Sequence, residues 1–289
     1  LIITNHHCVY GSLQFNSTPE RNLIADGFLA AELSAELPAA PGTYVYVTTG
    51  IRDVTKEVLG NPLAKLADAD YAREVERRSR QLVDACEKPG GRRCNVARFY
   101  EGSLFLEVTQ MEIRDVRLAY ASGEGIGNFG GEIDNWMWPR HTGDFSFYRA
   151  YVGKDGKPAA YSKDNVPYAP PAHLEVSTAP VRAGDFAMVA GYPGTTFRHR
   201  TASEFASQID WLLPKRLEVV GGMLQAIEAA TAGDKARQVL YASTVAGQKN
   251  TLKRAQGELD GLRRSDAVRV RAADEAAMLA WLAKQPDAV

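Results

Sequence analysis

The feature that most constrains the fold of this 289-residue chain is a change of sequence character near residue 197. Before this point, short segments rich in β-branched and aromatic residues recur, for example over residues 43–48, and such segments are typical of strands. After it, apolar residues return every three or four positions among Ala, Leu, Glu, Lys and Arg, which is the periodicity of amphipathic helices. We therefore predict a β-rich region over residues 1–197 and an all-helical region over residues 198–289.

One helical segment interrupts the β-rich region. Leu63, Val75 and Leu82 recur at helical spacing among many charged residues, which predicts an amphipathic helix inserted between strands near residues 62–87. Farther along, residues 185–192 form a short apolar run that ends in Gly, Tyr and Pro, and this pattern predicts a buried strand.

The composition is that of an ordinary globular protein and excludes several classes. Hydrophobic residues make up 45% and charged residues 24%, so a disordered chain is not expected. The net charge of −1 offers no basic field for nucleic acid. The sequence contains no apolar run of the roughly 18 residues that a membrane span requires. We therefore expect neither a nucleic-acid partner nor a membrane span.

The three cysteines, Cys8, Cys86 and Cys94, bear on the redox compartment. A turn-forming stretch with one Pro and two Gly separates Cys86 from Cys94, and such a loop can bring two Cα atoms within the roughly 4.4–6.8 Å of a disulfide. The alternative is two unrelated free thiols. A disulfide indicates an oxidising compartment. A zinc site is not expected, because the sequence contains neither C-x-x-C nor H-x-x-x-H spacing.

The segment Thr4-Asn5-His6-His7-Cys8 carries a candidate general base. A catalytic histidine directs one ring nitrogen at a nucleophile while a carboxylate holds the other, and a short turn after a strand can fix that orientation. The alternative is a pair of loop histidines without a role.

A candidate partner for this base is Asp144, which directly precedes the strand-like segment over residues 145–152. A carboxylate at the edge of a strand can accept a hydrogen bond from a histidine Nδ1–H and hold the ring in one tautomer. The alternative is an ordinary turn or capping aspartate.

A third feature is the segment Asp134-Asn135-Trp136-Met137-Trp138, which holds two of the four tryptophans of the chain. An Asn side chain offers a carbonyl acceptor and a Trp ring offers a π-face, and together they suit an ammonium group. The alternative is a pair of core tryptophans beside a turn asparagine.

Together these segments resemble the S46 peptidases, a family of bacterial dipeptidyl aminopeptidases. The resemblance covers essentially the whole chain and becomes looser through the helical region. The segments that carry it are Thr4-Asn5-His6-His7-Cys8-Val9-Tyr10-Gly11, Asn22-Leu23-Ile24-Ala25-Asp26-Gly27-Phe28, Asp53-Val54-Thr55-Lys56, Asp115-Val116-Arg117-Leu118-Ala119-Tyr120, residues 129–144 and Val189-Ala190-Gly191-Tyr192-Pro193-Gly194.

This resemblance implies a fold and a set of site residues. The fold would be a trypsin-like double β-barrel, occupying residues 1–197, with an inserted α-helical domain that begins over residues 198–289. The general base would be His7, with His6 the less favoured choice, and Asp144 would be its triad partner. Asn135, Trp136 and Asn250 would hold the α-amino group of the substrate. Cys86 and Cys94 match a family cysteine pair, and Cys8 would pair with a cysteine upstream of Leu1.

The family's nucleophilic serine lies in a Gly-Asn-Ser-Gly-Ser-Pro motif, and no Gly-x-Ser-Gly occurs in this sequence. Leu1 lies inside an expected strand and Val289 follows no helix-capping signal. We therefore expect an N-terminal fragment that lacks the nucleophile and is inactive alone.

The implied function of the complete protein is that of a serine exopeptidase releasing dipeptides from the free N-terminus of oligopeptides. The resemblance also implies that the complete protein needs no metal or organic cofactor. It further implies a homodimer that is located in the periplasm or outside the cell. The alternatives are a trypsin-like endopeptidase and an inactive, peptide-binding scaffold.

Overall fold

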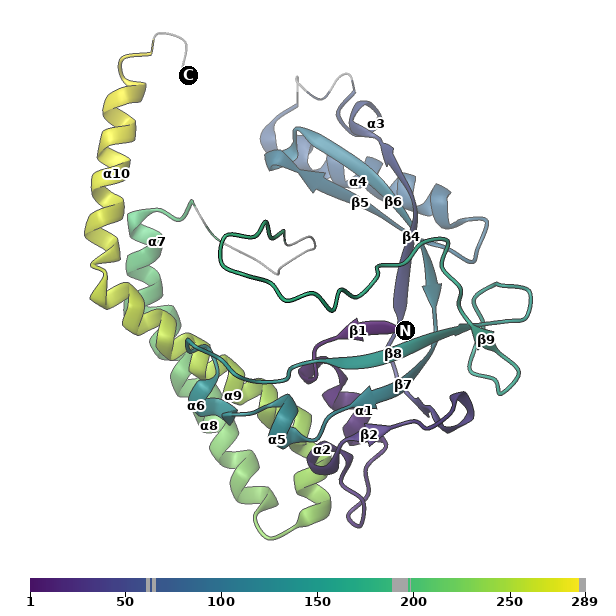
Figure 1. Cartoon of the computed structure of the whole chain (residues 1–289). Helices are drawn as coiled ribbons and strands as arrows, with labels where there is room; N and C mark the ends of the chain where they lie inside the picture. Colours follow the sequence, from purple (N-terminus) through teal and green to yellow (C-terminus); the bar gives the residue numbers. More distant parts are fainter. Residues whose placement is uncertain (61–62, 64–65, 189–196, 198, 286–289) are drawn as a thin grey trace. The chain divides into compact units, whose positions relative to one another are not determined.

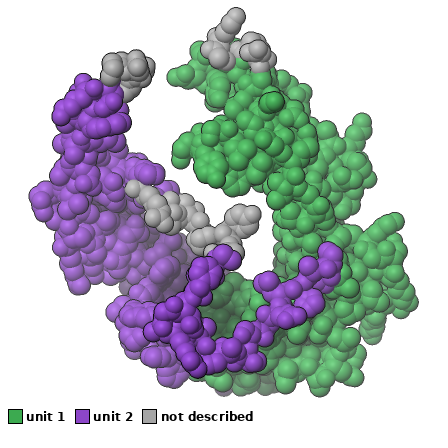
Figure 2. Space-filling model, turned by 45° about the horizontal axis from the view of Figure 1, so that its top comes forward, with its two compact units in different colours: residues 1–128, 143–169 green, residues 129–142, 170–289 purple. Residues whose placement is uncertain are grey.

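The computed structural model describes residues 1–60, 63, 66–188, 197 and 199–285. The chain divides into two compact units (Figure 2). Unit 1 contains Leu1–Asn128 and Gly143–Ala169, and unit 2 contains Phe129–Thr142 and Pro170–Val289. A single excursion of the chain, over residues 129–142, therefore leaves unit 1 and returns to it. The predicted division at residues 197 and 198 stays a prediction.

Unit 1 contains a six-stranded antiparallel sheet in which the order β1-β8-β7-β2 is extended by β3 beside β7 and by β9 beside β8 (Figure 1). The register places Ser146 at the start of β8 between Thr4 of β1 and Ala121 of β7. The ends of these three strands therefore come together, and the turns that follow them lie at one edge of the sheet. The strands are β1 (Ile2–Thr4), β2 (Phe28–Leu29), β3 (Leu37–Pro38), β7 (Asp115–Ala121), β8 (Ser146–Val152) and β9 (Val166–Pro167).

Short helices cover the face of this sheet that carries Ser146 and Tyr148. Val9 and Leu13 are fully buried there, and the Ser12 hydroxyl lies 2.6 Å from the Tyr148 hydroxyl. The helices of this face are a 3-10 turn at His7–Val9, α1 (Tyr10–Phe15), α2 (Leu23–Asp26) and α5 (Glu124–Gly127). A further 3-10 turn at Leu33–Ala35 lies beside the opposite face, where Leu33 lines a cavity with Phe147 and Arg149.

The second sheet of unit 1 has three antiparallel strands in the order β4-β6-β5, with α4 packed against it. Two aspartates in the first turn of α4 stabilise its N-terminus through the helix dipole. Val75 and Leu82 of α4 pack on a core formed by Val54, Val58 and Phe105. The elements are β4 (Val45–Asp53), α3 (Thr55–Leu59), α4 (Asp68–Glu87), β5 (Arg93–Phe99), a 3-10 turn at Tyr100–Gly102 and β6 (Leu104–Ile113).

Unit 2 is helical. The hydroxyl of Thr201 accepts from the Glu204 main-chain N–H and caps α7, and the Thr201 main-chain N–H donates to the Glu204 carboxylate, which completes a capping box. Helices α8 and α9 lie side by side (Figure 1), and Leu213, Ala255 and Leu259 form their buried core. The helices are α6 (Gly131–Asp134), α7 (Ala202–Ser207), a π-helical turn at Gln208–Leu212, α8 (Leu213–Thr231), α9 (Lys235–Arg264) and α10 (Ala267–Leu282). In the part of the chain that the structure describes, no helix is both long and apolar enough to span a membrane.

Of two expectations about β structure, one is not confirmed and the other is not met in its described part. Within the described residues the strand order of neither sheet closes on itself, so the double β-barrel is not confirmed. Closure needs a hydrogen-bonded ladder between the first and last strands, and β1 and β2 contain only three and two residues. The strand expected over residues 185–192 is absent from its described part, since residues 185–188 are irregular and Phe186 is 91% exposed. Residues 189–192 lie outside the described residues.

Candidate active site

His7 and Asp144 form the centre of the candidate site in unit 1. His7 follows β1 by three residues, and Asp144 precedes β8 by two, so the pairing of β1 with β8 brings them together. The ring Nδ1 of His7 lies 2.8 Å from Oδ2 of Asp144, and the His7 main-chain N–H donates to Oδ1 at 3.1 Å. The His7 side chain is 70% exposed and that of Asp144 is 23% exposed. The carboxylate therefore holds one ring nitrogen, and most of the ring faces solvent.

The electrostatics of Asp144 favour an ionised carboxylate. Its partial burial opposes ionisation, but hydrogen bonds from the His7 main chain, the His7 ring and the Asn5 amide outweigh burial and lower the pKa of Asp144. An ionised carboxylate only accepts hydrogen bonds, so Nδ1 of His7 carries the proton that they share. A neutral His7 ring then has Nε2 as its acceptor, which is the tautomer that a general base requires.

His6 occupies a different environment from its neighbour. Its ring is fully buried and donates from Nε2 to the Ser122 carbonyl, at 2.8 Å. Burial lowers the pKa of His6, against smaller opposing effects from the Ser122 carbonyl and nearby carboxylates. The ring also lies so close to Gly127 that a Cβ at this position would clash with the His6 ring. His6 thus packs the base-bearing turn against α5, and the pairing with Asp144 belongs to His7.

Asn135, Trp136 and Asn250 gather in unit 2. Asn135 and Trp136 follow α6, and Asn250 lies in α9, which α6 contacts. The side-chain oxygen of Asn250 accepts from Asn135 Nδ2 at 3.0 Å and from the Trp136 indole N–H at 2.9 Å. The structure therefore brings together the three residues that the family resemblance associates with one another. The indole uses its N–H here, so Trp136 contributes a hydrogen-bond donor as well as a ring.

Three further residues support this cluster and were missed by the sequence reasoning. Glu132 accepts from Asn135 Nδ2 at 3.1 Å, and Arg140 donates from Nη1 to Asn135 Oδ1 at 2.9 Å. These two contacts fix which way the Asn135 amide faces. Lys253 of α9 donates to the Ile133 carbonyl of α6 at 3.3 Å. The spacing of Glu132 from Asn135, three residues, is the one signal in the sequence that could have pointed to this support.

The predicted disulfide between Cys86 and Cys94 is present, with the two Cα atoms 6.2 Å apart. It ties the end of α4 to the start of β5 and so fixes α4 against the second sheet. Cys8 lies outside this bridge, is exposed and directly follows His7. Its pairing with a cysteine upstream of Leu1 stays a prediction.

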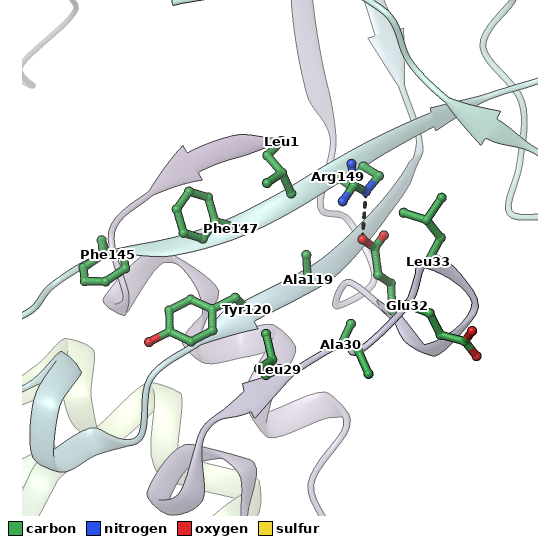
Figure 3. A pocket seen from close by; sticks show the side chains of 12 residues that line it. Leu1, Leu29, Ala30, Glu32, Leu33, Ala119, Tyr120, Phe145, Phe147 and Arg149 are labelled. Atoms are coloured by element: carbon green, nitrogen blue, oxygen red, sulfur yellow. Dashed lines mark hydrogen bonds and ion pairs between the residues drawn. The ribbon is translucent and has the colours of Figure 1, made fainter. Parts of the chain in front are cut away.

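Unit 1 also contains a cavity of about 620 Å³. It opens on the sheet face that carries Phe147 and Arg149, and Arg149 pairs with the Glu36 carboxylate at 2.7 Å (Figure 3). The aromatic rings of Tyr120, Phe145 and Phe147 lie close together along one wall. The lining residues are Leu1, Leu29, Ala30, Ala31, Glu32, Leu33, Glu36, Ala119, Tyr120, Phe145, Phe147 and Arg149. His7 and Asp144 are not among them, so this mainly apolar cavity is separate from the histidine–aspartate pair.

A histidine oriented by a carboxylate is typical of hydrolases that activate a nucleophile. The chain belongs to the peptidase S46 family, whose model matches residues 1–289, and the predicted membership is thereby confirmed. It is 41% identical over 99% of its length to an Asp/Glu-specific dipeptidyl-peptidase of Shewanella putrefaciens. It is 36% identical over 98% of its length to dipeptidyl-peptidase 7 of Porphyromonas gingivalis.

A solved structure of Porphyromonas endodontalis DPP11, in complex with the dipeptide Arg-Glu, superposes with a TM-score of 0.85 at 35% identity and covers 98% of the chain. The chain spans 39%, 40% and 41% of these three relatives, respectively. It thus corresponds to about two fifths of their length.

Proposed function

We propose that this chain supplies the general base and the amine-binding residues of a serine exopeptidase. The enzyme would release dipeptides from the free N-terminus of oligopeptides, with its nucleophilic serine outside this chain. The observation that carries the proposal is the 2.8 Å hydrogen bond between His7 Nδ1 and Asp144 Oδ2 in a member of the S46 family. The relatives named as dipeptidyl peptidases support the release of dipeptides.

In the proposed mechanism, His7 Nε2 accepts the proton of the serine hydroxyl as the serine oxygen attacks the carbonyl of the second peptide bond. Asp144 stabilises the imidazolium that forms and keeps the ring in place. His7 then returns the proton to the leaving amine, and water releases the dipeptide from the acyl-enzyme. Burial raises the pKa of Asp144, but three hydrogen bonds from His7 and Asn5 lower it by more. These bonds support the proposed role because they favour an ionised carboxylate.

Selectivity for a free N-terminus would come from Asn135, Trp136 and Asn250. An α-ammonium group carries three N–H donors and requires oxygen acceptors, which the two amide side chains provide. Binding the ammonium at a fixed distance from the nucleophile would determine that two residues are removed. The convergence of Asn135 and Trp136 on Asn250 supports this reading only in that it gathers the three side chains in one place.

The same proposal covers the fold, the cellular location and the oligomeric state of the complete protein. Unit 1 would form part of a trypsin-like double β-barrel in the complete protein, with the helical domain inserted from about residue 198. The Cys86–Cys94 disulfide supports a periplasmic or secreted location, because such bonds persist in oxidising compartments. We further propose that the complete protein is a homodimer, which its molar mass in solution would test.

The complete protein tests this function with peptides of identical sequence that have either a free or an acetylated N-terminus. Peptides with Asp or Glu at the second position follow the name of the Asp/Glu-specific relatives, and peptides with a hydrophobic residue there serve as the comparison. Release of dipeptides from free peptides alone supports the proposal, and this chain by itself should release none. Cleavage of the acetylated peptides would identify an endopeptidase instead. Peptide binding without hydrolysis would identify an inactive scaffold.

A further inference from the structure

We propose that Asn5 is a positioning residue of the histidine–aspartate pair. Its side-chain amide holds the Asp144 carboxylate in one rotamer and thereby fixes the direction in which the His7 ring faces the nucleophile. This inference rests on the proposed function and adds to it a residue that acts through Asp144.

The contacts of Asn5 surround the carboxyl group of Asp144. Its Nδ2 lies 3.2 Å from Oδ2 and 3.4 Å from the main-chain oxygen of the same residue. The His7 ring donates to that Oδ2 at 2.8 Å, and the His7 main-chain N–H donates to Oδ1 at 3.1 Å. Asn5 and His7, which lie on one turn, therefore supply the hydrogen bonds that the described structure gives this carboxylate.

The location of Asn5 explains how it reaches Asp144. Asn5 directly follows Thr4, the last residue of β1, and Thr4 is paired with Ser146 at the start of β8. Asp144 lies two residues before that pair. The antiparallel register therefore places the two strand ends side by side, and the Asn5 side chain needs to span only the gap between them.

A neutral amide is suited to this role. It donates hydrogen bonds without adding a charge that would compete with His7 for the carboxylate. Its hydrogen bond is among those that lower the pKa of Asp144. The nearby titratable groups are His6, which is buried and interacts with the charges of Asp144 and His7, and Glu124, whose charge acts on His6 and which accepts from Tyr10. An aspartate in place of Asn5 would remove the donor and place a second carboxylate beside Asp144.

The test uses the complete enzyme with the variants Asn5→Ala and Asn5→Asp, and Asn95→Ala as a matched control on exposed β5 surface. Asn5→Ala should lower kcat by about 10-fold with KM within about twofold, because the lost contact orients the base and does not bind substrate. Asn5→Asp should also move the acid limb of the pH profile of kcat/KM to higher pH, since a second negative charge favours the protonated His7 ring. Asn95→Ala should behave as the wild type.

Two results would overturn the inference. In the first, Asn5→Ala keeps the wild-type kcat and Asn5→Asp leaves the acid limb of the kcat/KM pH profile unshifted. The other is a loss of activity that only matches a loss of folded protein, measured as a lower Tm and a smaller fraction of titratable active sites.

Crystal structures of the wild type and of Asn5→Ala give a readout that does not depend on activity. The wild type should keep the amide within hydrogen-bonding distance of Asp144, and the variant should show the carboxylate rotated away from His7. An unmoved carboxylate would refute the role of Asn5. Absence of peptide hydrolysis by the wild type would instead refute the proposed function and leave this structural comparison valid.

Discussion

The two groups of candidate residues are held in place by different means. In unit 1, antiparallel strand pairing sets the positions of His7 and Asp144, and a main-chain N–H of His7 is itself one of the bonds to the carboxylate. In unit 2, Asn135, Trp136 and Asn250 meet through side-chain hydrogen bonds between a turn and a helix. The first group contains a charged acceptor and the second is built from neutral amides and an indole. We therefore expect substitutions to act in a nearly all-or-none way in the first group and in graded steps in the second.

The largest effect is expected for His7→Ala in the complete enzyme. If the His7 ring is the proposed general base, its loss should lower kcat by at least about 10⁴-fold, because base and nucleophile act as a unit. Steady-state kinetics on a free dipeptidyl substrate measure this loss. His173→Ala, which removes an exposed histidine, is the matched control. His6→Gln should retain measurable turnover, and the reverse order of His6 and His7 would contradict the choice of base.

A smaller and differently distributed effect is expected for Asn250→Ala. Removing the oxygen on which two donors converge should raise KM for peptides with a free N-terminus by about 10–100-fold, as for the loss of a hydrogen bond to a charged group, and change kcat little. Gln256→Ala, on the exposed surface of the same helix, is the control. A fall in kcat at constant KM would place Asn250 in the chemical step and remove the contrast between the two groups.

Sequence patterns reached the residues of both groups and the hydrogen bond between a histidine Nδ1 and Asp144, but not the contacts that orient Asp144 and Asn135. The strand pattern after Asp144 and the turn-forming loop between Cys86 and Cys94 correctly indicated β8 and the disulfide, because both depend on local sequence. The contact between Asn5 and Asp144 could not be predicted from local sequence. It depends on the register of two strands that lie about 140 residues apart, since Asn5 and Asp144 are separated by 139 positions.

The support around Asn135 was missed for another reason. Glu132 and Arg140 act through the orientation of an amide, which depends on rotamers and not on residue type. The double β-barrel likewise could not be confirmed from strand signals, because period-two patterns predict strands without stating which strands pair. The prediction of a double β-barrel rested on the family resemblance alone. The described residues show two open sheets.

The contrast between the adjacent histidines predicts a pH dependence of stability. Burial lowers the pKa of His6, while the unfolded chain binds a proton at the ordinary value of 6.5. The unfolded state then binds more protons below that pH, so the free energy of unfolding should decrease as the pH falls below about 6.5. Denaturant unfolding from pH 7.5 to 5.5 measures this decrease.

Substituting each histidine separates this effect from general acid denaturation. His6→Gln should flatten the decrease in that interval, because the titrating group is removed, and the exposed His173→Gln should leave it as in the wild type. Equal slopes for all three proteins would mean that the buried His6 ring does not control the acid side of the stability profile.

The smallest effect is expected for Lys253→Met, which removes an ammonium group and keeps the alkyl stem. Lys253 donates to the Ile133 carbonyl at 3.3 Å and so links α9 to the turn that carries Asn135 and Trp136. Loss of one exposed hydrogen bond of about 0.5 kcal/mol should raise KM about twofold, and kcat should not change. Lys249→Met, also in α9, breaks an ion pair with Glu228 of α8 and controls for the change of charge. A tenfold rise in KM for Lys253→Met alone would show that the second group is as tightly fixed as the first, and that a single link between α6 and α9 governs the position of Asn135, Trp136 and Asn250.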